Sequence, residues 1–436
     1  MTPTKPVFKL HSEEVTRLCS HVELNENQFS HQPGSVWGNI ALIAGTTVGA
    51  GILALPAVTL PSGVLPSTVL LIAVWLYTVI SALLLAEVCV NAMRLEGRLS
   101  IGLLAMVEGI LGFVGARIAG AAYLFLHYAL LVAYMTQGGN ILVSGVSQIW
   151  KLENVPPGWL GTMIFTLFFG GMMYLGRQKF IEKLNSVFVA IVITSFVGLL
   201  FLGGGQVQTV QLLTHNWTAL GSAVSVMLVA LFFHNVVPVV VTQLEGDIPK
   251  IRQSIIIGSL IPLIMFLTWN AVILGSVSLD IGESTGNFDP LQILRSGGNG
   301  KGLGVLLSIF SEFAIATSFI GFVYGLLDFF KDIFPVKQGK AFGRLPLYSM
   351  ILLPPMSLGA INPSIFFNAL DVAGTFSISV LGGIIPALMS WKQRQEEQLN
   401  SLNQPLVPGG KVTLILMIGI ASVLILKQIL SMSGYL

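Results

Sequence analysis

The 436 residues are 54% hydrophobic and only 10% charged, with a mean hydropathy of +0.82. A soluble protein of this length needs far more charge to cover its surface, so the composition excludes that class and indicates a polytopic membrane protein. The net charge of +2 gives no reason to expect nucleic acid as a partner. The two cysteines, Cys19 and Cys89, predict no disulfide framework.

The first 36 residues are mixed polar and include four glutamates, Glu13, Glu14, Glu23 and Glu26. They lack the apolar core of a signal peptide, and the glutamates argue against a transit peptide. We therefore expect residues 1–36 to form a soluble cytoplasmic tail.

Eleven apolar segments follow, most of them near the roughly 20 residues that a helix needs to cross a bilayer. They are expected at 37–59, 64–93, 116–145, 159–176, 181–204, 218–243, 252–276, 303–333, 346–361, 364–390 and 412–431. The ninth is short and contains Pro354-Pro355. Residues 100–113 are apolar but too short to cross after the second span, so we expect an interfacial helix there. The sequence thus predicts an all-α polytopic membrane protein with about 11 transmembrane helices.

The basic residues give an orientation. With the N-terminus inside, 18 of the 22 Lys and Arg residues lie in predicted inside segments, and Lys151, Arg295 and Lys301 lie in predicted outside loops. This asymmetry is typical of the positive-inside pattern. It predicts a cytoplasmic N-terminus, a cytoplasmic loop at 391–411, and an eleventh helix with the C-terminus at 412–436. We expect a multi-pass protein of the plasma (inner) membrane.

The spans divide into two similar sets of five, 37–204 and 218–390. Five is odd, so the second set is inverted relative to the first. The first span of each set carries an interruption: GTTVGAG in span one and FFHNVVP in span six. Interrupted segments in corresponding positions indicate a substrate site near the bilayer midplane.

The span-one pattern has two other interpretations. From Gly49 it has the G-x-G-x-x-A spacing of a dinucleotide-binding turn, but no soluble strand precedes it and the nearest downstream carboxylate is Glu87. Gly45 and Gly49 also form a helix-packing G-x-x-x-G motif. Packing alone does not account for Gly51 and the following Pro56, so a broken helix is the better interpretation.

A helix broken inside lipid frees backbone groups, and these are tolerated only where they line a protein cavity. Freed N–H groups at a helix N-terminus suit a carboxylate, and freed carbonyls suit an ammonium group or a cation. A site that offers both predicts a zwitterion, and amino acids are the natural substrate class.

The run GTTVGAGILALPAVTLPSG, the run FFHNVVPVV and the eleven-span layout resemble the hydroxy and aromatic amino acid permeases. These are the tyrosine and tryptophan permeases of the amino acid–polyamine–organocation superfamily, and the resemblance covers roughly residues 37–430. It implies a five-plus-five inverted repeat like that of the bacterial leucine transporter, with broken helices 1 and 6. It also implies secondary active transport by symport with alternating access, without a cofactor. Carried over by position, the resemblance puts Thr46, Thr47, Gly49 and Gly51 at the carboxylate site and Phe233, His234 and Asn235 on the opposite wall.

Span three carries polar and aromatic residues on one helical face, Tyr123, His127, Tyr134 and Gln137. Lipid does not favour such a face, so it is expected to turn toward the protein interior. It either serves structural hydrogen bonding or lines the pocket, where His127 can titrate near neutral pH. The full set of expected substrate-binding residues is Thr46, Thr47, Gly49, Ala50, Gly51, Tyr123, His127, Tyr134, Phe232, Phe233, His234 and Asn235.

Four residues are candidates for ion coupling. Thr317 and Ser318 belong to a small-residue stripe of span eight, which favours helix packing. They also fall where hydroxyls complete a cation site in sodium-coupled relatives, and such oxygens are hard ligands. Asp371 lies far from any basic residue and is a proton-carrier candidate, as is Glu312, because intramembrane acids are costly. Glu87, by contrast, shares a face with Arg94 and is expected to form a structural pair.

Three functions compete with proton-coupled symport of tyrosine or tryptophan. A membrane-embedded enzyme lacks support, because the sequence holds no metalloprotease, nucleophile-elbow, P-loop or Cys/His metal motif. An amino acid sensor or channel on the same fold is disfavoured by the absence of a large signalling region. Sodium-coupled transport of other neutral amino acids remains open. The expected partners are an amino acid, a coupling ion (H+ or Na+) and the lipid bilayer, with no nucleic acid.

Overall fold

The computed structural model describes residues 22–25, 28–31, 34–49, 51–96, 102–151, 156–205, 207–276, 301–333, 343–395 and 405–433. Apart from one short antiparallel hairpin in the predicted tail, β1 Val22–Asn25 with β2 Gln28–His31, these residues are predominantly helical. The predicted all-α polytopic fold is confirmed. The first 21 residues of the predicted tail lie outside the described residues.

In the residues that the structure describes, sixteen α-helices are defined, some of them parts of one span. They are α1 Val36–Thr47, α2 Gly51–Thr59, α3 Val64–Glu96, α4 Leu103–Trp150, α5 Gly158–Phe165, α6 Gly171–Leu175, α7 Gln178–Gly204, α8 Thr209–Leu213, α9 Val224–Ala230, α10 Val237–Gln243, α11 Ile248–Ser276, α13 Lys301–Ile333, α14 Arg344–Ile361, α15 Phe366–Val372, α16 Ile385–Gln393 and α18 Gly410–Met432. Between them lie π-helical turns, η1 Thr166–Gly170 and η5 Ala373–Ile384, and 3-10 turns, η2 Trp217–Ser222 and η3 His234–Val236.

Within the described ranges, nine helical segments are long and apolar enough to cross a membrane, or ten if α1 and α2 form one bent span. The predicted ninth span, 346–361, is helix α14, which contains Pro354 and Pro355 and is not among these ten. The count of eleven therefore stays a prediction. The predicted short helix at 100–113 is present as the start of α4, set off by a break at Gly112 with φ 77°. Its place at the membrane surface also stays a prediction.

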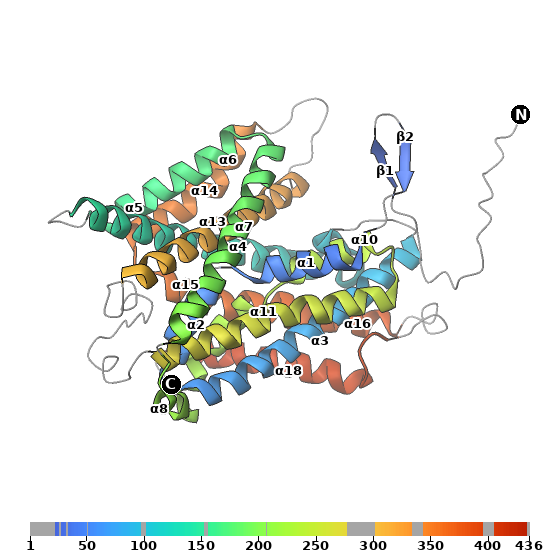
Figure 1. Cartoon of the computed structure of the whole chain (residues 1–436). Helices are drawn as coiled ribbons and strands as arrows, with labels where there is room; N and C mark the ends of the chain where they lie inside the picture. Colours follow the sequence, from blue (N-terminus) through green and yellow to red (C-terminus); the bar gives the residue numbers. More distant parts are fainter. Residues whose placement is uncertain are drawn as a thin grey trace, which may run out of the picture.

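The helices pack in three groups (Figure 1). Helices α5, α6 and α14 lie together at one side, and α3, α11, α16 and α18 lie at the other. Between them, α4 packs on α5, α14 and α13, and α13 packs along α7. Helix α1 lies against α11, and η5 packs on both α4 and α18. Buried side chains of α1, α4, α13 and η5 all belong to the one large hydrophobic core.

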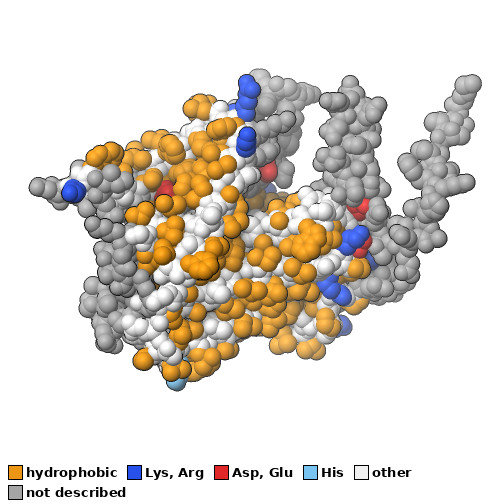
Figure 2. All heavy atoms as spheres, viewed as in Figure 1, with side chains coloured by type: hydrophobic (Ala, Val, Ile, Leu, Met, Phe, Trp, Pro, Cys, Tyr) orange, Lys and Arg blue, Asp and Glu red, His pale blue; other side chains and the backbone are white. Residues whose placement is uncertain are grey.

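The outer surface is strongly apolar. Figure 2 shows hydrophobic side chains spread across the visible face, with Lys and Arg near its edges. Large side chains such as Phe201 and Leu175 are 82% and 80% exposed. Exposed apolar area of this extent is unfavourable in water and suits lipid.

Both predicted helix interruptions are present. Helix α1 begins after Ser35, whose hydroxyl accepts from the Gly38 N–H at 2.8 Å, and it ends at Thr47. Helix α2 begins at Gly51 and is bent by 53° from α1. Helix α9 ends at Ala230, and α10 begins only at Val237. The spans that carry the two sequence breakers are therefore each divided into two half-helices.

Prolines inside the spans leave helical carbonyls without their usual partner, because proline has no N–H to bond the carbonyl four residues earlier. Pro56 lies four residues after Ile52, whose carbonyl accepts from the buried Trp269 Nε1–H at 3.0 Å. In α14, Pro354 lies four residues after Met350, and the Tyr128 hydroxyl donates to the Met350 carbonyl at 2.7 Å.

The same arrangement recurs at the junction of η5 and α16. Pro386 lies four residues after Gly382, and the Ser81 hydroxyl of α3 donates to the Gly382 carbonyl. In all three cases the donor comes from a different helix. These hydrogen bonds therefore satisfy a buried carbonyl and join two spans at the same time.

Replacing Tyr128 with Phe should lower the free energy of unfolding by about 1–3 kcal/mol, the cost of leaving a buried carbonyl unpaired. The matched control is Tyr174→Phe, since the Tyr174 ring packs on Tyr348 and its hydroxyl donates to no described residue. Thermal unfolding in detergent, followed by fluorescence, measures the difference. Equal melting temperatures for the two variants would contradict the proposed role of the proline-orphaned carbonyl.

A buried ion pair joins α3 and α16 near the ends that the sequence predicts to be cytoplasmic. Glu87 is 1% exposed, and Arg394 binds both of its oxygens, Nε to Oε1 at 2.7 Å and Nη2 to Oε2 at 2.8 Å. The Ser390 hydroxyl and the Leu406 N–H also donate to this carboxylate, at 3.2 and 2.9 Å. Glu87 is thus paired, as predicted, and the arginine that binds both of its oxygens is Arg394. The partner lies 307 residues away in sequence, where helical spacing gives no indication of it.

Glu87→Gln should destabilise the protein by about 3 kcal/mol, because it leaves a largely buried arginine without its counter-charge. Lys250→Ala removes an ion pair with Asp247 in which the lysine side chain is 50% exposed, and such pairs contribute about 0–1 kcal/mol. The same melting experiment compares the two. A Glu87→Gln shift no larger than that of Lys250→Ala would show that the buried pair contributes little.

Candidate functional site

The two helix interruptions touch each other. A β-carbon placed on Gly51 would lie 2.7 Å from Ala230 Cα, so the start of α2 and the end of α9 approach backbone to backbone. A β-carbon on Gly49 would lie 2.5 Å from Ser318 Oγ of α13. Glycine is needed at Gly51 because the neighbouring atom is backbone, whereas a side chain at position 49 would require the Ser318 hydroxyl to move. Three spans, the first, sixth and eighth, therefore converge at the breaks.

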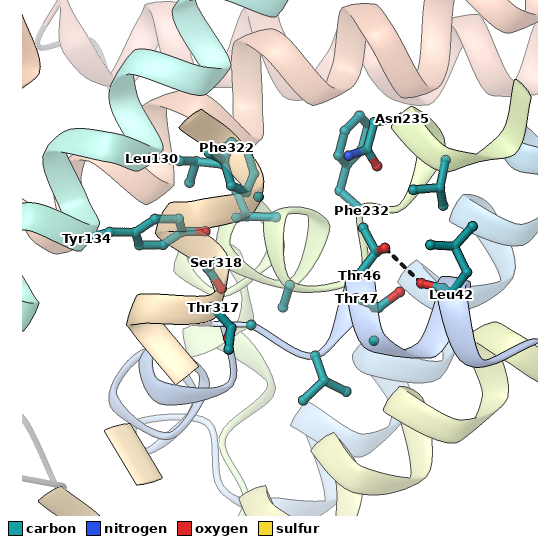
Figure 3. Close-up of a pocket in the computed structure, with 18 of the residues that line it drawn as sticks. Leu42, Thr46, Thr47, Leu130, Tyr134, Phe232, Asn235, Thr317, Ser318 and Phe322 are labelled. Carbon is teal, nitrogen blue, oxygen red and sulfur yellow. Dashed lines mark hydrogen bonds between the residues drawn. The ribbon is translucent and has the colours of Figure 1, made fainter. Parts of the chain in front are cut away.

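A cavity of about 460 Å³ opens beside this junction (Figure 3). Its volume lies in the range of small-molecule sites. Its walls come from α1, the α2 start, α4, α7, the span-six break, α13 and η5. The lining residues are Ala41, Leu42, Gly45, Thr46, Thr47, Val48, Gly49, Gly51, His127, Leu130, Tyr134, Asn185, Val189, Val229, Ala230, Phe232, Asn235, Val236, Thr317, Ser318, Gly321, Phe322 and Ile378.

The cavity brings together most of the residues expected at a substrate site. Eight of them line it: Thr46, Thr47, Gly49, Gly51, His127, Tyr134, Phe232 and Asn235. Thr317 and Ser318, expected at an ion site, line it as well. Tyr123, Phe233 and His234 are not in the lining, and Ala50 lies outside the described residues. The expected residues thus include both residues that line the cavity and residues that lie behind its lining, and their role in binding substrate stays a prediction.

Several lining residues were not expected from the sequence. Leu130 and Phe322 lie on the same helical faces as His127 and Ser318, so extending those faces by one turn would have found them. Asn185 and Val189 of α7 also line the cavity. The sequence pattern of the fifth span gives no signal for them.

Two threonines close the end of α1, and both use their protons within the helix. Thr46 Oγ1 donates to the Leu42 carbonyl and Thr47 Oγ1 to the Ile43 carbonyl, each at 2.7 Å (the first is drawn in Figure 3). Their oxygens keep lone pairs but have no proton to offer a ligand. In this conformation the hydroxyls suit an ammonium group or a cation better than the carboxylate expected from the resemblance.

Donors for a carboxylate lie instead at the start of α2. Gly51 lines the cavity and is the first residue of this nine-residue helix. The first-turn N–H groups of a helix have no intrahelical acceptor, and the positive end of its dipole favours an anion. One of them, that of Ile52, bonds the Gly49 carbonyl at 3.2 Å. The α1 end therefore offers acceptors and the α2 start offers a positive helix end.

One wall of the cavity is aromatic. Phe322 meets Tyr134 edge to face, with ring centroids 5.6 Å apart, and lies 4.8 Å from the His127 ring. Figure 3 shows the Tyr134 hydroxyl pointing toward Ser318, and Phe232 on the opposite side. Tyr123 stacks on the far side of His127 at 3.9 Å, so it supports this wall from behind.

The two candidate acids lie elsewhere. Asp371 of α15 accepts from Gln428 Nε2 of α18 at 2.8 Å and is not in the cavity lining. Glu312 of α13 has buried carboxylate oxygens and is also not in the lining. No cluster of three or more His, Cys, Asp or Glu residues that could hold a metal occurs in the described part of the chain.

Comparison with known proteins gives a consistent result. Tyrosine-specific transport system 2 of Haemophilus influenzae is 30% identical over 407 residues, which cover 92% of this chain and 97% of that protein. The tryptophan-specific transport protein of Shigella flexneri is 28% identical over 406 residues, covering 90% and 94%. Glutamine transporter 2 of Aliivibrio fischeri is 25% identical over 402 residues, covering 90% and 99%.

These relatives are transport proteins, and none is named as an enzyme. The similarity runs over nearly the whole chain and is not confined to the broken helices. The tryptophan/tyrosine permease family matches residues 32–428, and the chain belongs to that family.

Proposed function

We propose that the protein is a secondary active transporter that carries tyrosine and tryptophan across the plasma (inner) membrane by proton symport with alternating access. The observation that carries this proposal is the aromatic-walled cavity at the junction of two interrupted helices. Family membership supports transport of aromatic amino acids. The alternatives of a sensor or a channel differ in that neither would accumulate substrate against a gradient.

The two ends of the cavity suit the two charges of an amino acid. The N-terminus of α2 favours the carboxylate through its N–H groups and dipole. The lone pairs of Thr46 and Thr47, together with carbonyls at the end of α1, favour the ammonium group. These groups lie on either side of the same helix break, a few residues apart. A zwitterion placed across the break has both charges matched.

The rest of the cavity suits an aromatic side chain. Phe232, Phe322 and Tyr134 provide rings that can pack edge to face or offset against a substrate ring, which adds about 0.5–1.5 kcal/mol beyond burial. Leu130, Val189 and Ile378 complete an apolar surround. Two amides, Asn185 and Asn235, also line the cavity, and one of the relatives is named as a glutamine transporter. Glutamine is therefore the substrate to compare with tyrosine and tryptophan.

The conformation supports alternating access. The cavity is lined by α1 from Ala41 onward, and beyond Gly51 the α2 half is buried. On that side Trp269 bonds the Ile52 carbonyl, and Thr59 Oγ1 donates to Asn270 Oδ1 at 2.6 Å. With the N-terminus in the cytoplasm, as the basic residues favour, this is the cytoplasm-facing state. We propose that 37–204 and 218–390 are two inverted repeats, and that spans within and between them move relative to one another between this state and the outward state.

Accumulating a substrate requires a driving gradient, and the sequence contains no nucleotide-binding motif. A coupling ion must therefore supply the energy. Protons are favoured by the resemblance to proton-coupled permeases. Thr317 and Ser318 line the cavity with hydroxyl oxygens that would also suit Na+, so sodium is the alternative that a direct measurement must exclude.

Purified protein in liposomes should accumulate labelled tyrosine and tryptophan when a pH gradient is imposed in sodium-free buffer. A proton symporter requires the gradient, and a protonophore should abolish accumulation. Competition with unlabelled tyrosine, tryptophan and glutamine ranks the substrates, and the aromatic amino acids should compete at least about tenfold better, as expected for about 1.4 kcal/mol of ring contacts. Uptake that requires sodium and ignores pH would refute proton coupling, and equilibration without accumulation would indicate a channel.

Gly49→Ala should reduce uptake at least about tenfold and lower the melting temperature, because the added methyl group would lie 2.5 Å from Ser318 Oγ and overpacking costs about 1–3 kcal/mol. The control is Gly171→Ala in α6, where a β-carbon meets nothing within 4 Å. The double variant Gly49→Ala/Ser318→Ala removes the contacting oxygen and should recover the melting temperature. A single variant as stable and active as Gly171→Ala would show that α1 does not approach α13 as described.

A further inference from the structure

His234 occupies an unusual position in the span-six break. It begins the short η3 turn, directly between Phe233 and the cavity-lining Asn235, yet it is only 2% exposed. The ring of cavity-lining Phe232 stacks on it, with centroids 4.9 Å apart at 16°, and the Phe233 ring lies 5.6 Å away. The imidazole is therefore separated from the cavity by one aromatic ring.

On its other side the imidazole packs against the π-helical η5 of the tenth span. A β-carbon on Gly382 would lie 3.5 Å from His234 Cε1 and 3.6 Å from Nε2, so a residue without a side chain makes room for the ring. The same β-carbon would lie 3.5 Å from Ile378 Cγ2, and Ile378 lines the cavity. The ring is thus held between the two moving parts, the broken sixth span and the tenth span.

Both ring nitrogens, Nδ1 and Nε2, are buried and form no hydrogen bond with any described residue. No Asp, Glu, Lys or Arg occurs in α1, α9, α10 or η5. The polar groups that α3 brings to this region are the hydroxyls of Tyr77, which donates to the Met417 carbonyl, and Ser81, which donates to the Gly382 carbonyl. Glu87 of α3 is engaged by Arg394. In this conformation a protonated ring would have no acceptor for either N–H.

We propose that His234 is the proton-binding residue that couples the pH gradient to substrate transport, acting from behind the cavity wall and not as a substrate contact. The assignment rests on the proton symport proposed above. A hydronium ion from bulk solvent gives its proton to a ring nitrogen, leaving water, when the sixth and tenth spans separate and hydrate the imidazole. When they close as they do here, the dry site expels the proton to water in the cytoplasm-facing cavity. A ligand drives a conformational change only if its affinity differs between the two states, and hydration of this ring provides that difference.

His127 is the alternative proton-binding residue, and its hydrogen bonding differs from that of His234. Its Nδ1 lies 2.9 Å from the Tyr123 carbonyl of the same helix, and its ring lines the cavity. That hydrogen bond moves with α4 and is available in either conformation. His127 therefore lacks the change of environment that coupling requires.

Three histidine variants in liposomes test the assignment. His234→Gln should lose accumulation driven by the pH gradient at least about tenfold, while substrate counterflow, which needs no net proton movement, stays within about threefold of wild type. Its counterflow should also no longer depend on pH. His215→Gln, which changes an exposed histidine of the loop after α8, should behave as wild type. His127→Gln changes a cavity-lining residue and should lower uptake, but its ratio of gradient-driven accumulation to counterflow, and the pH dependence of its counterflow, should stay those of wild type.

The outcomes separate the two proposals. If the wild-type protein ignores the pH gradient, proton symport fails and this assignment fails with it. If the wild type responds and His234→Gln responds equally, or if only His127→Gln loses coupling, the assignment to His234 alone is overturned.

A measurement on the wild-type protein covers the case in which His234→Gln does not fold. Hydrogen exchange at the imidazole C2 position, resolved for each histidine by mass spectrometry, gives a titration midpoint for His234. Because linkage is reciprocal, saturating tyrosine or tryptophan should raise this midpoint by about one pH unit, which corresponds to tenfold coupling. The midpoint of His215 should not move. A His234 midpoint that is indifferent to substrate would overturn the assignment.

Discussion

The structure depends on hydrogen bonds, formed within the protein, to backbone N–H and C=O groups that lipid cannot bond. A carbonyl or N–H left unpaired in hydrocarbon costs on the order of several kcal/mol. The backbone groups freed at each interruption of a membrane helix must therefore form hydrogen bonds within the protein. At Ile52 and Met350 a downstream proline removes the normal partner, and an indole or phenol from another span replaces it. These hydrogen bonds join α2 to α11 and α14 to α4. The prolines that weaken individual helices thereby specify contacts between helices.

The cavity is a consequence of the same constraint. The breaks near Val48 and Leu231 cannot face lipid, and the contact of Gly51 with Ala230 places them against each other in the interior. Backbone groups that remain unpaired there can be satisfied by a ligand. This explains why the region with the least regular secondary structure coincides with the cavity. It also explains why small residues, and not the aromatic wall, form the junction itself.

The sequence predicted the helical elements closely because apolar length and proline or glycine punctuation are local properties. It located both breaks and placed eight of twelve expected site residues on the cavity. It failed where the answer depends on distant segments. Helical spacing offered Arg94 as the partner of Glu87, although Arg394 provides it, and nothing local indicates that Ser81 reaches the Gly382 carbonyl. The sequence also cannot predict which side chains face the cavity at a helix break, because neighbouring residues such as His234 and Asn235 follow no regular helical spacing there.

The distribution of charge around the cavity bears on how an ion gradient can be used. Among the acids in the described spans, Glu87 is neutralised by Arg394, and Asp371 accepts a hydrogen bond from Gln428 away from the lining. A permanently ionised group in the wall would bind tightly in every conformation and would carry a large desolvation cost through the cycle. A histidine gains a proton in water below about pH 6.5 and is neutral when desolvated, so in the proposed mechanism its charge would follow the opening and closing of the spans around it. The cavity wall is built from hydroxyls, amides, aromatic rings, aliphatic side chains and the His127 imidazole. The role proposed for His234 behind this wall would let one proton bias two conformations without a fixed charge at the substrate site.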